Sequence, residues 1–152
     1  KPDRRQRQMC IRDSVGIHAV DVAGLGGTNW TRIEAARRDD SAIFDPFLDW
    51  GLPTVEAISE VRAACPNDRL IASGGVRHGL DAAKALWLGA ALVSMAGPVL
   101  RALTTDGIQA PDPRSALQAM DRCKAQLRLA LFLTGAPDLA AFAGVPGFIG
   151  TR

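Results

Sequence analysis

The segment Ser73-Gly74-Gly75-Val76-Arg77 combines the residue types that bind a phosphate group. An apolar run ends in two adjacent glycines, and a helix is expected to begin a few residues later. Glycine lets the backbone turn sharply and brings its N–H groups close to a ligand. A helix start adds unpaired donors and the positive end of the helix dipole, and the arginine adds a cation. The segment therefore predicts an anion site made by Gly74, Gly75, Val76 and Arg77.

Two further turns have a similar character. Met95-Ala96-Gly97-Pro98 follows another apolar run and precedes another helical stretch, and Gly24-Leu25-Gly26-Gly27-Thr28 ends a third apolar run. Each turn is a weak signal by itself. Loops that follow parallel strands lie at the same end of a barrel, where barrel enzymes build their sites. Taken together, the turns predict that Thr28, Ala96 and Gly97 join the same phosphate site.

The remaining polar residues in these segments have structural explanations that we favour over catalytic ones. Asp21 lies in an apolar strand, where an ionised carboxylate needs a partner, and we expect nearby backbone or Lys84 to supply it. His18 is expected to pack within its strand. His78 is expected to cap or decorate a helix start.

Aromatic and sulfur-containing residues add little chemistry. Trp30 and Trp50 fall in an irregular segment, where they could cover a ligand, although loop aromatics more often just pack. Cys65 and Cys123 lie in helical patterns without a CxxC motif or a histidine at metal-ligand spacing. Reduced structural cysteines in a cytosolic protein are the expectation, and no metal site is predicted in this chain.

Composition fits one domain with a core of its own. The chain has 152 residues, of which 47% are hydrophobic, and no apolar run is long enough to cross a membrane. The formal net charge of +2 arises in residues 1–14, where five basic residues face two acidic ones. Without that tail the chain is close to neutral, so neither nucleic-acid nor membrane binding is predicted.

Residues 1–14 contrast with everything that follows them. They are charged and unpatterned, and Gln8-Met9-Cys10-Ile11-Arg12-Asp13-Ser14 resembles a translated sequencing adapter. We expect a non-native tail over 1–14 and a barrel portion over 15–152. A natural disordered basic tail is the alternative.

Strands and helices alternate along the chain. Strands are predicted over 15–23, 70–73 and 91–95, and helices over 54–65, 81–88, 98–103, 115–133 and 137–142, with an irregular segment over 29–52 that holds a short helix near 31–38. The longest helix is expected to pack as core through Leu117, Met120, Leu127 and Leu131.

This alternation predicts an α/β fold with parallel strands and helical crossovers. The strands are apolar throughout, as strands buried on both faces are. Three such units cannot close a (β/α)8 TIM barrel of about 250 residues. We therefore predict its carboxyl-terminal part, about strands six to eight. A doubly wound sheet is the competing architecture.

The combined motifs resemble those of type 2 isopentenyl-diphosphate isomerases. The resemblance runs in order through most of the chain, in the segments Val20-Asp21-Val22-Ala23-Gly24, Gly26-Gly27-Thr28, Asp49-Trp50-Gly51-Leu52-Pro53-Thr54, Ile71-Ala72-Ser73-Gly74-Gly75-Val76-Arg77, Gly79-Leu80-Asp81-Ala82-Ala83-Lys84-Ala85-Leu86 and, near the end, Gln126-Leu127-Arg128 with Leu133-Thr134-Gly135.

This resemblance implies an FMN-dependent barrel enzyme of isoprenoid biosynthesis that interconverts isopentenyl and dimethylallyl diphosphate. It also implies NADPH as the source of reducing equivalents, Mg²⁺, a homo-oligomer of four or more subunits, and a cytoplasmic location. By residue match, the FMN contacts would be Thr28, Gly74, Gly75, Val76, Arg77, Ala96 and Gly97. The family's metal-binding glutamate and its flavin-contacting lysine have no counterpart here, so no catalytic residue is assigned.

Two other functions remain open at this point. One is an FMN-dependent 2-hydroxy-acid oxidase or dehydrogenase, which usually carries a His–Gly–Gly–Arg arrangement at the position of residues 24–28. No histidine occupies that loop here, which counts against it. The other is a non-catalytic, truncated chain that binds FMN or phosphate without turnover.

Overall fold

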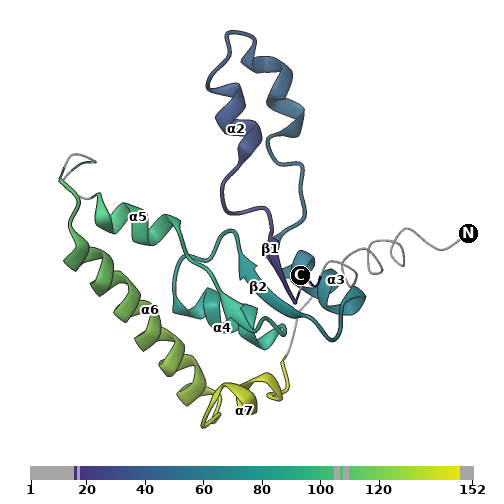
Figure 1. Cartoon of the computed structure of the whole chain (residues 1–152), viewed down its shortest axis with the longest axis vertical. Coiled ribbons are helices and arrows are strands. Elements are labelled where there is room, and N and C mark those ends of the chain that lie inside the picture. Colours follow the sequence, from purple (N-terminus) through teal and green to yellow (C-terminus); the bar gives the residue numbers. More distant parts are fainter. Residues whose placement is uncertain (1–15, 17, 105–106, 108–109, 148–152) are drawn as a thin grey trace, which may run out of the picture.

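A three-stranded parallel sheet organises the chain. The computed structural model describes residues 16, 18–104, 107 and 110–147, so the expected tail over 1–14 lies outside the described residues. Strands β1 (Ala19–Ala23), β2 (Arg69–Ser73) and β3 (Leu92–Val93) lie side by side in chain order (Figure 1). Both pairings are parallel. The predicted strands are confirmed, although the first and the third are shorter than expected.

Helical crossovers join these strands. Helix α3 (Thr54–Ala64) connects β1 to β2, and α4 (Gly79–Trp87) connects β2 to β3. Right-handed crossovers between strands that advance in one direction place both helices on the same face of the sheet. A doubly wound sheet would reverse the strand order and carry helices on both faces. The strand order does not reverse within the described residues, so the predicted α/β fold with parallel strands and helical crossovers is confirmed, and it agrees with a portion of a (β/α)8 barrel.

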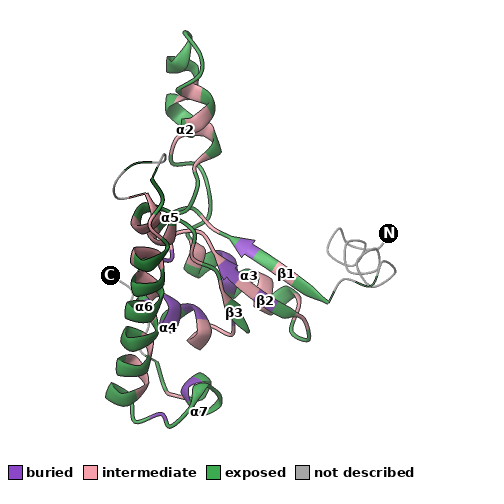
Figure 2. Ribbon diagram, turned by 60° about the vertical axis from the view of Figure 1, so that its left-hand side comes forward, coloured by how far each residue is buried: buried purple, intermediate pink, exposed green. Residues whose placement is uncertain are grey.

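Three helices follow the sheet, in the order α5 (Gly97–Leu103), α6 (Pro113–Leu133) and α7 (Leu139–Ala143). Helix α6 packs against α4 and α5. Its expected role as a core helix is wrong in part, because none of its residues is buried and Leu117 is 61% exposed. Leu127 and Leu131 are half-buried against a small cluster around Phe142. Figure 2 shows the largely exposed surface of α6.

The main core lies between the sheet and its crossover helices. Val22, Leu70 and Ala72 point from the strands toward Ile58 of α3 and Ala85 of α4, and all five are buried. The other face of the sheet is open. Leu92 on that face is 61% exposed, so the expectation that the strands are buried on both faces is wrong for this structure. His18, expected to be packed, is also exposed and precedes β1.

An excursion between β1 and α3 projects away from the sheet. It contains α2 (Trp30–Ala35) and the 3₁₀-helix η1 (Ser41–Phe47), and Figure 1 shows it standing beyond the end of β1. Asn29 caps α2 by accepting the Arg32 N–H at 2.9 Å. Sequence analysis predicted the short helix but not the 3₁₀-helix. Both tryptophans of the excursion, Trp30 and Trp50, are exposed.

The start of α6 provides a pH-sensitive contribution to stability. Asp112 is its N-cap and accepts hydrogen bonds from the backbone N–H of Arg114 at 2.9 Å and from the hydroxyl of Ser115 at 2.6 Å. The Ser115 hydroxyl is the main cause that lowers the pKa of Asp112 below its ordinary value of 3.8. Because the folded pKa is the lower one, the carboxylate stabilises the fold above the ordinary pKa. That contribution is lost as the pH falls through the folded pKa.

We expect Asp112→Ala to lower the melting temperature at neutral pH, because the backbone N–H of Arg114 and the hydroxyl of Ser115 lose their acceptor. The difference from wild type should begin to shrink as the pH falls below about 4, where Asp112 is protonated in the unfolded state, and should disappear once the pH is below the lowered pKa of the folded state. Circular dichroism melts across this range measure the effect. Asp121→Ala, on the same helix but away from its start, is the control. A difference that stays constant with pH would contradict this account of Asp112.

Candidate functional site

The three predicted turns meet at the carboxyl ends of the strands. They enclose a cavity of about 640 Å³, here called the loop cavity, between residues 24–28, 73–77 and 94–98. The structure places every residue of the sequence-predicted site in the lining of this one cavity, namely Thr28, Gly74, Gly75, Val76, Arg77, Ala96 and Gly97. Their role in binding a cofactor stays a prediction.

Glycine is required where the first two turns touch. A Cβ atom at Gly27 would lie 2.6 Å from the Cα of Gly74, and one at Gly74 would lie 2.6 Å from the carbonyl oxygen of Gly24. Gly74 and Gly75 also have φ values of +77° and +80°, which side-chain-bearing residues rarely adopt. The two turns therefore pack backbone against backbone, which brings main-chain groups to the cavity.

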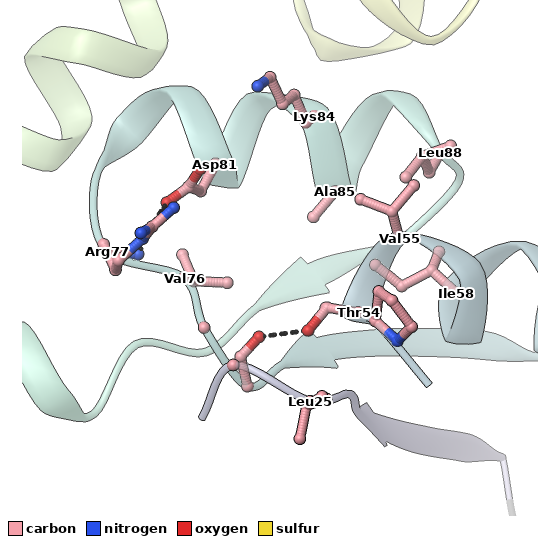
Figure 3. Close-up of a pocket in the computed structure, with 14 residues that line it drawn as sticks. Leu25, Thr54, Val55, Ile58, Val76, Arg77, Asp81, Lys84, Ala85 and Leu88 are labelled. Carbon is pink, nitrogen blue, oxygen red and sulfur yellow. Dashed lines mark hydrogen bonds and ion pairs between the residues drawn. The ribbon is translucent and has the colours of Figure 1, made fainter. Parts of the chain in front are cut away.

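Hydrogen bonds from neighbouring elements fix these turns. The Thr54 hydroxyl at the start of α3 donates to the Gly74 carbonyl at 2.6 Å (Figure 3). The Leu25 N–H donates to the Leu52 carbonyl at 2.7 Å. The N–H groups of the next two residues, Gly75 and Val76, have no partner among the residues that the structure describes. They remain available to an anion.

Two arginines contribute positive charge to the cavity. Arg77 has a side chain that is 71% exposed, and its Nε lies 3.4 Å from Asp81 Oδ2. Arg101 also lines the cavity and was missed from sequence. Its spacing from Gly97 was the available signal, because residues four apart on a helix lie on one face. A Cβ at Gly97 would lie 3.4 Å from Nη1 of Arg101.

A carboxylate also faces the loop cavity. Asp21 accepts a hydrogen bond from the Ser73 hydroxyl at 2.6 Å, and both residues line the cavity. The side chain of Ser73 is thus the partner of Asp21, and the expectation of nearby backbone or Lys84 as its partner is wrong. Lys84 lies on α4, where it lines a separate cavity of about 280 Å³ that we call the outer cavity (Figure 3). A carboxylate repels phosphate but accepts hydroxyl donors, so Asp21 suits a neutral, hydroxyl-bearing part of a ligand.

Other candidate residues take structural positions. The cap prediction for His78 is confirmed, since its Nδ1 accepts the Asp81 N–H at 3.2 Å at the start of α4. Trp30 lines the loop cavity. Cys65 and Cys123 are half-buried and form no disulfide within the described residues, and burial raises the pKa of Cys123. The described residues contain no cluster of three or more His, Cys, Asp or Glu side chains that could hold a metal ion.

The sequence profile of the family described as FMN-dependent dehydrogenase matches residues 14–144, most of the chain. The chain belongs to the FMN-dependent dehydrogenase family. Membership in this family agrees with the anion-binding character of the turns, since flavin mononucleotide ends in a phosphate group.

Curated relatives of this chain carry the name isopentenyl-diphosphate delta-isomerase. The protein of Xanthobacter autotrophicus is 49% identical over 133 residues, which cover 86% of this chain and 37% of the relative. The protein of Stutzerimonas stutzeri is 48% identical over 128 residues, covering 82% and 35%. The chain thus spans about a third of the length of these relatives.

Solved structures support the barrel-type α/β fold of this chain. A mandelate oxidase variant superposes with a TM-score of 0.63 at 22% sequence identity, covering 90% of this chain and 35% of the other. A second mandelate oxidase structure gives a TM-score of 0.62, covering 99% and 45%. At this identity the likeness concerns the fold alone.

Among the described residues, no helix is both long and apolar enough to cross a membrane.

Proposed function

We propose that this chain provides the FMN phosphate site of an isopentenyl-diphosphate delta-isomerase. The observation that carries the proposal is the convergence of all seven sequence-predicted residues on the loop cavity. The names of the relatives, which are 40–53% identical, support the isomerase reaction. The family match supports the cofactor.

The residues of the loop cavity fit a flavin mononucleotide by their chemistry. The N–H groups of Gly75 and Val76, which have no partner among the described residues, are suitable donors to phosphate oxygens, and the two arginines would balance the phosphate charge. Asp21 and Ser73 would face the hydroxyl-bearing chain of the cofactor.

The chain's own contribution would be binding and orientation. When bound, reduced FMN supplies the proton transfer that moves the double bond of the substrate. Interlocked glycine turns hold the phosphate end in place, and Trp30 contributes an aromatic wall. We assign no residue here to the substrate diphosphate, to Mg²⁺ or to NADPH. Their use by the whole protein, its homo-oligomeric state and a cytoplasmic location are proposals that rest on the relatives.

Hydroxy-acid oxidation is the less favoured alternative. That chemistry needs a general base to take a proton from the substrate, and histidine serves this role most often. None of the residues that line the loop cavity is a histidine. His78, the nearest in sequence, is engaged as the cap of α4.

The test is turnover by the intact protein that carries this sequence. We expect conversion of isopentenyl diphosphate to dimethylallyl diphosphate only with reduced FMN and Mg²⁺ present. Lactate and glycolate, supplied to the oxidised protein, serve as the comparison substrates. Oxidation of either one would favour the alternative. Tight FMN binding without turnover of any of these substrates would favour a non-catalytic flavin-binding protein.

A further inference from the structure

We propose that Asp81 is a positioning residue that holds the Arg77 guanidinium at the wall of the loop cavity, where it meets the phosphate. This inference rests on the proposed function. It assigns a task to a carboxylate that lines the outer cavity and is not among the residues that line the loop cavity.

One carboxylate oxygen fixes both the backbone and the side chain of Arg77. Asp81 Oδ2 accepts the backbone N–H of Arg77 at 3.1 Å and lies 3.4 Å from its Nε (Figure 3). A guanidinium carries five N–H donors in a rigid fork. With Nε directed at Asp81, its two terminal nitrogens have no partner in the described part of the chain. They are the donors that would reach the phosphate.

Arg77 and Asp81 differ in the cavities that they line. Arg77 lines both the loop cavity and the outer cavity, whereas Asp81 lines only the outer one. The carboxylate therefore contacts Arg77 from the side of the outer cavity and does not line the loop cavity. This arrangement lets the carboxylate orient the cation without occupying the anion site.

Asp81 is the fixed member of the pair. Its side chain is 18% exposed, against 71% for Arg77. His78 Nδ1 lies 3.5 Å from the same Oδ2 and accepts the Asp81 backbone N–H. An exposed arginine otherwise loses considerable rotamer freedom when it binds a ligand. Anchoring Nε in advance reduces that loss.

Charge repulsion opposes this effect. A carboxylate near an anion site weakens phosphate binding, but solvent strongly reduces the interaction at this exposed surface. We expect the gain in FMN affinity from orienting the Arg77 guanidinium to exceed the loss from this repulsion. Asp81→Asn should then weaken FMN binding by about tenfold, as expected for a charge-assisted contact that loses its geometry.

The experiment compares FMN, riboflavin and inorganic phosphate as ligands of the full chain, by flavin fluorescence and calorimetry. The variants are Asp81→Asn, Arg77→Ala and the double variant. Asp121→Asn is the matched control, because Asp121 makes an ion pair of the same 3.4 Å length with Lys124 on α6. We expect Asp81→Asn to weaken FMN and phosphate, to spare riboflavin, and to have no further effect when Arg77 is already alanine.

Three results for the variants would overturn the inference. Equal weakening of FMN and riboflavin would show a merely structural role, and tighter FMN binding would show that repulsion dominates. Additive effects of the two substitutions would show that Asp81 does not act through Arg77. If wild type binds phosphate but not FMN, with the expected variant pattern, the proposed function fails while the role of Asp81 stands. If it binds neither, both fail.

Discussion

Gly74→Ala is expected to lower the free energy of unfolding by about 2–5 kcal/mol, which combines the cost of a positive φ with that of overpacking. The new methyl group would lie 2.6 Å from the carbonyl oxygen of Gly24, so the two turns must separate. Separation displaces the N–H groups of Gly75 and Val76. FMN binding should therefore fall below detection even where the variant is still folded. Urea unfolding and flavin fluorescence measure the two effects.

Gly135→Ala is the matched control for this substitution. Gly135 has a φ of +71°, close to the +77° of Gly74, but a Cβ there meets no atom within 4 Å. It should cost only about 1–2 kcal/mol for the backbone conformation and leave FMN affinity unchanged. Equal effects of the two substitutions on stability and on FMN affinity would mean that the contact between the turns is unimportant.

Arg77→Ala is expected to weaken FMN binding by about 1.5–3 kcal/mol, or roughly tenfold to more than a hundredfold, the contribution of a hydrogen bond to a charged group. Stability should change little, because the side chain is 71% exposed and its ion pair is solvent-screened. Riboflavin, which lacks the phosphate, should bind equally well to both proteins. Isothermal titration with each flavin measures the difference.

Lys84→Ala provides the control for charge. Lys84 lies on α4, the helix that begins two residues after Arg77, and is exposed, but it lines the outer cavity and not the loop cavity. Its removal lowers the net charge by the same amount and should leave FMN affinity within about twofold. If the Arg77 and Lys84 variants lost the same FMN affinity, Arg77 would act only through its positive charge and not through a direct contact with the phosphate.

Local sequence signals were sufficient for the turns and for most of the fold. Paired glycines after an apolar strand can adopt the positive φ values of Gly74 and Gly75, and few other residues can. Regular alternation of strands and helices predicted a parallel sheet, because parallel strands require long crossovers. These features depend on neighbours in sequence, which a single chain displays.

Features that depend on distant neighbours were harder to predict. The partner of Asp21 depends on the register of β1 against β2, which brings Ser73 within 2.6 Å. Arg101 reaches the loop cavity only because α5 starts at that cavity's edge. Exposure of Leu117 on α6 could not be inferred either, since an apolar helical stripe shows what can be buried but not what is present to cover it.

The contact between the glycine turns has a consequence for protein engineering and for evolution. Since the residues of one turn leave no room for side chains on the other, a change in either must be matched by its neighbour. Substitutions at these two places should covary or be jointly forbidden when many sequences are compared. A designer who wishes to graft this binding site onto a different scaffold must transfer both segments, with their relative spacing, as one inseparable module.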